Sequence, residues 1–94
     1  MHNPITLTIY LLAECPGCER ARRTAAAVRA RVPDIRVKLI DLDDGQAPPA
    51  SVFGVPAYVL NGHLISHGNP RLETLLELIA AQRGAADGDA SHRA

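Results

Sequence analysis

Apolar and polar residues alternate in the first part of the chain, from Ile5 to Leu12. A period of two residues is typical of a strand with one buried face. A second alternating segment runs from Ile35 to Ile40, with Arg and Lys at the polar positions. Charged side chains on one face are common at the edge of a sheet. The pattern therefore predicts two strands, over residues 5–12 and 35–40, of which the second is partly exposed.

Between these strands the apolar residues recur at spacings of three and four, which fits one face of a helix. Pro16 suits the first helical turn, where its missing N–H would have no partner. Pro33 ends the helix, because proline disfavours helical geometry in the residue before it. We therefore expect Cys18 to point toward the core and the arginines of this helix to face solvent. The apolar face comprises Cys18, Ala21, Ala25, Val28 and Val32.

Two further apolar runs, over residues 55–60 and 63–67, flank Asn61-Gly62. Asn-Gly is typical of a tight hairpin, because both turn positions need a positive φ. The segment before the hairpin, residues 41–51, is rich in Asp, Gly and Pro and predicts a connection made of turns. It leaves room for at most one helical turn, over residues 49–53.

The last periodic segment predicts a second helix. Asn69 can cap this helix, Pro70 fits its first position, and Gly84 can end it. Residues 85–94 are small and polar without periodicity, so we expect a flexible C-terminal tail after a domain that covers residues 1–84. The apolar stripe of the helix comprises Leu72, Leu75, Leu76 and Ile79.

Length and charge limit the classes of function. The chain has 94 residues, enough for one core, and a formal net charge of +0 with acidic and basic residues interspersed. This distribution argues against nucleic acid or an anionic membrane as a partner. The first residues show neither a cationic leader nor a long apolar run. We therefore expect a soluble cytoplasmic protein that binds neither nucleic acid nor membranes.

The chain has 2 cysteines, and both lie in Cys15-Pro16-Gly17-Cys18 at the predicted start of the first helix. A disulfide across so short a loop removes little chain entropy, so it is better suited to opening and closing than to stabilising a fold. In a reducing compartment such a pair is either catalytic or metal-binding. The free N–H groups and the dipole of a helix N-terminus favour a thiolate at Cys15.

Three elements in this order resemble the thioredoxin superfamily: Cys15-Pro16-Gly17-Cys18 after a strand, Val55-Pro56, and Asn61-Gly62 before a strand that ends near Gly68. The resemblance covers residues 5–83. Because the chain starts at the strand before the cysteines, it is similar to the short, glutaredoxin-like form. The resemblance implies an α/β minimal thioredoxin fold, strand-helix-strand-loop-strand-strand-helix, with the main helices packed against a four-stranded mixed sheet.

The resemblance also implies roles for individual residues. Cys15 would be the exposed nucleophile that forms a mixed disulfide, and Cys18 the resolving thiol. Pro16-Gly17 and Val55-Pro56 would contact the substrate; Pro56 would follow a cis bond, and the backbone of Val55 would pair with an extended substrate segment. The implied activity is that of a dithiol–disulfide oxidoreductase without a cofactor. It would act as a monomer on protein disulfides and be reduced again by a reductase or a thiol donor.

Several residues near the motif depart from the family. Glu14 and Glu19 place negative charge close to Cys15, which opposes thiolate formation and would raise the pKa of that thiol. His67 ends a predicted strand near the site and would be placed to modulate the thiolate. At the last helix, Pro70 lacks the N–H that a carboxylate of glutathione would need. We therefore expect little use of glutathione.

Two metal-based functions remain open alternatives. Copper-chaperone domains also place two cysteines with this spacing between a strand and a helix, and thiolates bind Cu(I) and zinc. Those domains usually carry Met where this chain has Ala13, and they close with a strand instead of a helix. The cysteines of a thioredoxin-like domain can also bridge an iron–sulfur cluster between subunits. His63 and His67 would lie roughly 13 Å apart along a strand, too far for one ion, so we expect no metal site.

Overall fold

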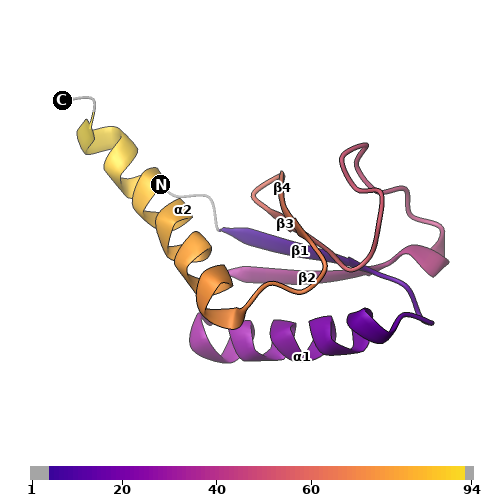
Figure 1. The fold of residues 1–94 in the computed structure, drawn as a ribbon. Coiled ribbons are helices and arrows are strands. Elements are labelled where there is room, and N and C mark those ends of the chain that lie inside the picture. Colours follow the sequence, from indigo (N-terminus) through magenta and orange to yellow (C-terminus); the bar gives the residue numbers. More distant parts are fainter. Residues whose placement is uncertain (1–4, 93–94) are drawn as a thin grey trace.

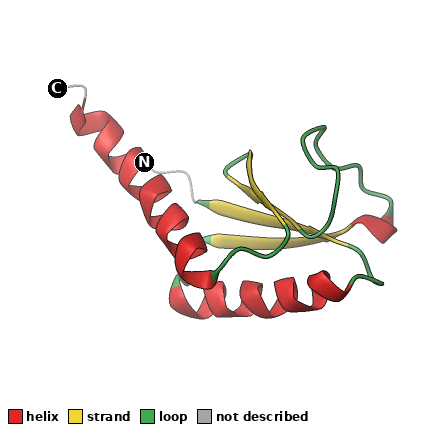
Figure 2. Ribbon diagram, in the orientation of Figure 1, coloured by secondary structure: helices red, strands yellow, loops and turns green. Residues whose placement is uncertain are grey.

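Four strands form a single mixed sheet (Figures 1 and 2). The computed structural model describes residues 5–92, with side chains as far as Gly84. The elements are β1 (Thr6–Leu11), α1 (Pro16–Arg31), β2 (Arg36–Asp41), the 3-10 helix η1 (Leu42–Asp44), β3 (Ala57–Leu60), β4 (His63–His67) and α2 (Leu72–His92). The strand order is β2-β1-β3-β4, with β1 parallel to β2 and the other neighbours antiparallel. The predicted α/β order of elements and the mixed sheet are confirmed.

Both helices pack against the same face of the sheet. Leu7, Ile9 and Leu11 alternate along β1 and are fully buried on that face. The helices cover them with one continuous cluster, to which α1 contributes Ala21, Ala25 and Val28, and α2 contributes Leu75 and Ile79. Alanine lets α1 lie close to the strands, since its side chain occupies little of the space between the layers. The apolar stripe predicted for the first helix is confirmed.

The opposite face of the sheet carries a smaller cluster, and among residues 5–92 no α-helix covers it. The loop between η1 and β3 lies over part of this face and buries Val52 against Tyr10 and Val59. One turn forms in the loop, where the N–H of Val52 donates to the carbonyl of Pro49 at 2.9 Å. The predicted connection, with room for at most one helical turn, is confirmed.

The start of α2 differs from the prediction. The helix begins at Leu72, and the N–H of Leu75 donates to the carbonyl of Arg71 at 2.9 Å. Asn69 and Pro70 therefore lie before the helix instead of forming its cap and first position. The reason is that the carboxamide of Asn69 makes bonds to residues of other elements, as described below.

The end of α2 also differs. The helix runs through Gly84 to His92, so Gly84 does not end it. A glycine ends a helix when it takes the left-handed conformation, and the glycines with positive φ among the described residues are Gly45, Gly62 and Gly68. The flexibility predicted for residues 85–94 stays a prediction, and residues 93–94 lie outside the described residues.

Candidate active site

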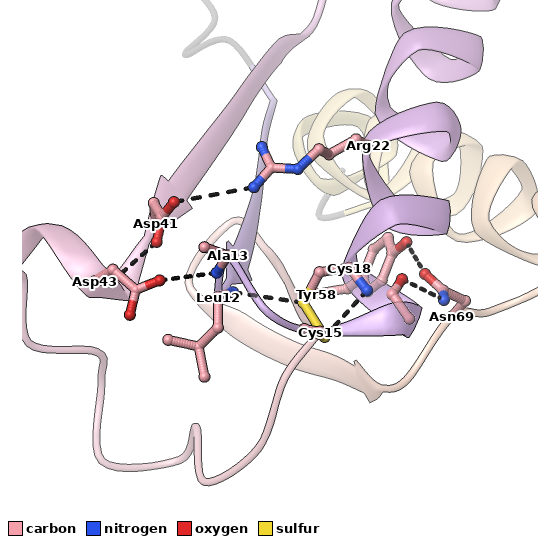
Figure 3. The surroundings of a disulfide bond; sticks show 10 residues. Leu12, Ala13, Cys15, Cys18, Arg22, Asp41, Asp43, Tyr58 and Asn69 are labelled. Atoms are coloured by element: carbon pink, nitrogen blue, oxygen red, sulfur yellow. Dashed lines mark hydrogen bonds and ion pairs between the residues drawn. A yellow bond between two sulfur atoms is a disulfide. The ribbon is translucent and has the colours of Figure 1, made fainter.

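The site begins with a disulfide between Cys15 and Cys18, whose Cα atoms lie 5.1 Å apart (Figure 3). Cys15 is the N-cap of α1, with an extended backbone at φ −149° and ψ 110°, and Pro16 occupies the first helical position. The extended strand thus changes to helix within the motif, because proline fits a first turn where no N–H is needed. The structure places both cysteines at a helix N-terminus, as predicted.

The two cysteines differ in exposure. Cys18 is 1% exposed and belongs to the main core, whereas Cys15 is half-buried at the edge of that core. Backbone N–H groups point at both sulfur atoms: that of Cys18 donates to Cys15 Sγ at 3.1 Å, and that of Leu12 donates to Cys18 Sγ at 3.4 Å. Donors of this kind stabilise a thiolate more than a thiol. The geometry therefore provides an accessible sulfur and a protected one, each with a donor.

The Val55–Pro56 bond is cis. Pro56 is buried and lies against the motif: a Cβ atom on Gly17 would come within 3.2 Å of Pro56 Cδ. The carbonyl of Pro56 accepts a 2.7 Å hydrogen bond from the N–H of Gly68. Residues far apart in sequence thus meet beside the disulfide. Val55 is half-buried and packs against both core clusters.

No protein-family model and no curated protein matches the sequence. Solved structures do match the fold. The thioredoxin of Fasciola hepatica superposes with a TM-score of 0.67 and 19% identity, over 83% of this chain and 80% of the other. Thioredoxin-2, a component of malaria parasite protein secretion machinery, superposes with a TM-score of 0.73 and 19% identity, over 86% of this chain and 85% of the other. Mitochondrial thioredoxin 3 from Saccharomyces cerevisiae, in its oxidised form, superposes with a TM-score of 0.67 and 22% identity, over 85% of this chain and 80% of the other. The chain has the thioredoxin fold.

Within this thioredoxin fold, Asn69 connects three elements at the site. Its Oδ1 accepts a 2.7 Å hydrogen bond from the Tyr58 hydroxyl, and its Nδ2 donates to the carbonyl of Gly17 at 2.9 Å. Sequence reasoning assigned Asn69 only to a helix cap. Tyr58 could have indicated a polar partner such as Asn69, because a buried tyrosine hydroxyl on a strand needs a hydrogen-bond partner. Burial raises the pKa of Tyr58, and a hydrogen bond with the Thr24 side chain partly offsets the rise.

On another side of the motif, η1 holds the loop before Cys15. The Asp43 carboxylate accepts a 2.8 Å hydrogen bond from the N–H of Ala13, and the N–H of Asp43 donates to the Asp41 carboxylate at 2.9 Å. Arg22 lies 3.9 Å from the same Asp41 carboxylate. This loop and η1 border a hollow of about 250 Å³, lined by Leu12, Ala13, Glu14 and Asp43. Sequence reasoning assigned no role to Asp43, since a residue of a turn carries no signal for a distant N–H.

Glu14, Glu19 and His67 lie at different places around the thioredoxin fold. Glu14 and Glu19 are exposed, where solvent weakens their effect on Cys15. The Nε2 atom of His67 accepts a hydrogen bond from the N–H of Phe53 at 3.3 Å, and the two rings lie 4.0 Å apart between centroids. His67 thus contacts the loop that leads into Val55–Pro56. Its predicted influence on the thiolate, like that of the glutamates, stays a prediction.

The described residues contain neither a group that could hold a metal ion nor a helix that could span a membrane. Within that part of the chain, no group of three or more His, Cys, Asp or Glu residues is placed to hold a metal ion. None of the helices described is both long enough and apolar enough to cross a membrane.

Proposed function

We propose that this protein is a thiol–disulfide oxidoreductase that reduces or exchanges protein disulfides through a mixed disulfide on Cys15. The observation that carries the proposal is the unequal exposure of the linked cysteines at a helix N-terminus: Cys15 is half-buried and Cys18 is 1% exposed. An outer sulfur can reach a partner, whereas an inner sulfur meets only the outer one. The close contact between Pro56 and Gly17 and the likeness to solved thioredoxins also support this function.

The proposed reaction begins from the dithiol. The Cys15 thiolate attacks one sulfur of the substrate disulfide, the substrate S–S bond breaks, and its other sulfur leaves as a thiolate that takes a proton. Cys18 then loses its proton and attacks Cys15 Sγ. The mixed disulfide breaks, the second substrate thiol is released, and the Cys15–Cys18 disulfide forms. The substrate gains two electrons and the protein loses two, which a thiol donor or a reductase returns.

The substrate would lie along Val55 and Pro56, with Pro16 and Gly17 forming the other wall of the contact. We propose an extended polypeptide here, because the backbone of Val55 offers the pairing mode of an added strand. Glutathione is a poorer fit. Pro70 has no N–H to offer a carboxylate, and the carboxamide of Asn69 is already bonded to Tyr58 and Gly17.

A redox titration combined with a trapping variant tests the proposal. The purified chain is equilibrated in dithiothreitol buffers of graded poise, and free thiols are counted by alkylation and mass spectrometry. We expect one two-electron transition of the Cys15–Cys18 pair. Cys18→Ser should trap a stable mixed disulfide with a protein disulfide such as that of insulin, whereas Cys15→Ser should trap none. A pair that stays in one redox state across the physiological range would overturn the proposal.

The nature of the electron donor and the state of the protein in solution are further parts of the proposal. We propose a reductase as donor, a monomeric protein and a cytoplasmic location, where reduced thiols are maintained. Regeneration assays with a flavoprotein reductase and with glutathione compare the donors under matched conditions. Size-exclusion chromatography with light scattering measures the oligomeric state.

A further inference from the structure

We propose that Tyr58 and Asn69 are positioning residues that polarise the peptide group between Gly17 and Cys18, so that its N–H binds the Cys15 thiolate more strongly. The inference rests on the proposed function only in taking Cys15 as the reactive thiolate. It concerns residues outside the Cys15–Cys18 pair, and its effect can be measured without any substrate.

The residues form a continuous chain of hydrogen bonds that ends at sulfur (Figure 3). The Tyr58 hydroxyl donates to Asn69 Oδ1 at 2.7 Å, and Asn69 Nδ2 donates to the Gly17 carbonyl at 2.9 Å. The Gly17 carbonyl and the Cys18 N–H belong to one peptide group. That N–H is shared between two acceptors of Cys15: it donates to Sγ at 3.1 Å and to the carbonyl oxygen at 3.0 Å.

The direction of this chain is fixed by the chemistry of its members. A backbone carbonyl can only accept, so the carboxamide of Asn69 must turn its Nδ2 toward Gly17 and its Oδ1 toward Tyr58. Oδ1 can only accept, so the Tyr58 hydroxyl must donate. Burial raises the pKa of Tyr58, which keeps that proton in place across the physiological range. Every bond therefore points the same way, toward the sulfur of Cys15.

Aligned hydrogen bonds strengthen one another. A donor at a carbonyl oxygen draws electron density from the amide and makes the N–H of the same peptide group a better donor; the carboxamide of Asn69 transmits the effect of Tyr58 in the same way. The gain is largest when the final acceptor is charged, and the thiolate of Cys15 is such an acceptor. This chain of hydrogen bonds, here called the relay, thus favours the thiolate form of Cys15.

Burial protects the relay from competing water. Tyr58 is fully buried, Cys18 is 1% exposed, and Asn69 and Gly17 are half-buried. A low local dielectric strengthens each bond. The last bond is an N-cap contact: the side chain of an N-cap residue accepts from the N–H of the third residue of its helix, and Cys15 holds the N-cap position of α1. We therefore expect the same contact in the dithiol form.

The test measures the thiolate of Cys15 directly in the reduced protein. The rate of Cys15 alkylation by iodoacetamide is followed against pH, with the modified residue identified by mass spectrometry. Tyr58→Phe removes the first donor, together with the hydrogen bond to Thr24, and keeps the bonds from Asn69 to Gly17 and from Cys18 to Cys15. A strengthening of about a fifth in a charge-assisted bond corresponds to roughly a twofold change in thiolate population. We expect Tyr58→Phe to slow alkylation below the pKa of Cys15 by about twofold, and Asn69→Leu to slow it more.

Two controls separate the relay from a merely structural tie. In the Asn69→Leu background, Tyr58→Phe should cause no further slowing, because the relay is already interrupted; additive effects would contradict the proposal. Asn61 serves as a matched asparagine, since its Oδ1 accepts from the N–H of Thr6 at 2.8 Å at the other end of β1. Asn61→Gly, which removes this acceptor and tolerates the positive φ of 49° at that position, should leave the alkylation profile unchanged.

A fall in unfolding free energy with an unchanged pH profile of alkylation, in both relay variants, would overturn the inference and leave Asn69 as a structural contact. This outcome differs from failure of the proposed function, which is read from redox cycling of the cysteine pair in the unmodified chain. Circular dichroism of each variant confirms that the profile is measured on a folded protein.

Discussion

Gly17 and Pro56 are in close contact: a Cβ atom on Gly17 would lie 3.2 Å from Pro56 Cδ, which is tighter than usual, and 3.6 Å from Asn69 Nδ2, which is an ordinary contact. The backbone at Gly17 does not have a positive φ, so its glycine is explained by packing and not by conformation. The contact joins the start of α1 to the cis bond before β3. A change at Gly17 therefore affects both the cysteine motif at the start of α1 and the Val55–Pro56 segment before β3.

Gly17→Ala should reduce activity far more than stability. Alanine favours the helix by up to about 1 kcal/mol, which offsets part of the crowding against Pro56. The displaced loop at Pro56 should lower the rate of insulin reduction by about tenfold, because small errors of position are costly in a reacting site. Gly84→Ala is the matched control. A Cβ there meets nothing within 4 Å, so it should stabilise α2 and leave the rate unchanged; equal rates for the two variants would contradict the prediction.

Asp43→Ala should loosen the loop before Cys15. The variant loses the 2.8 Å bond from the N–H of Ala13, and we expect a loss of about 1 kcal/mol in the free energy of urea unfolding. Asp43→Asn keeps an acceptor oxygen and should lose less. It also removes a negative charge near the motif and should speed alkylation of Cys15 in the reduced protein. Asp44→Ala, at an exposed neighbour in η1, is the control, and a loss as large as that of Asp43→Ala would count against the role of Asp43.

Phe53→Ala should slow the reduction of protein disulfides without changing the reduction of small disulfides. Phe53 is 85% exposed, and its ring contacts that of His67 at a tilt of 40° beside the loop that leads to Pro56. An exposed ring contributes little to folding, so we expect an unfolding free energy within about 0.5 kcal/mol of the original. Loss of about 1 kcal/mol of partner contact would slow insulin reduction roughly fivefold, while reduction of a small aliphatic disulfide stays unchanged. Leu78→Ala, at an exposed apolar residue of α2, should change neither rate. An equal effect on both classes of disulfide would show that Phe53 supports the motif instead of the partner.

Local signals in the sequence were sufficient for the motif and the element order, but not for the contacts that connect them. The positions of Cys15 and Cys18 follow from strand and helix periodicity, whereas the place of Pro56 beside them was implied by the resemblance to the thioredoxin superfamily. Asn69 carries a cap signal as well, yet its side chain bonds to residues 11 and 52 positions away in sequence. A cap contributes about 1 kcal/mol, and two bonds to groups at the core edge outweigh it.

The end of α2 shows the same limit for glycine. Gly84 was expected to stop the helix, but a glycine in helical conformation between good helix formers costs only about 1 kcal/mol and lets the helix continue. Gln82 and Arg83 precede it, and Ala85 and Ala86 follow it. The signal for a stop is a left-handed backbone, which composition alone does not reveal.

Tyr58→Phe should make the protein more resistant to alkaline pH. Burial raises the pKa of Tyr58 above its usual value of 10.0, so the unfolded chain releases this proton at a lower pH than the folded protein does. The stability that Tyr58 provides is therefore complete below pH 10.0 and is lost as the pH rises through the folded pKa, with a slope of at most about 1.4 kcal/mol per pH unit.

The phenylalanine of the Tyr58→Phe variant has no proton to lose. At neutral pH the variant should be less stable by about 1 kcal/mol, because Asn69 Oδ1 loses its donor. Between about pH 9 and pH 11 the two unfolding free energies should converge, as measured by urea unfolding of the oxidised protein. Tyr10→Phe keeps Tyr58, so its unfolding free energy should fall at alkaline pH as it does in the original chain. If the unfolding free energies of Tyr58→Phe and the original chain instead change in parallel with pH, Tyr58 has the same pKa in the folded and the unfolded protein, and the prediction is wrong.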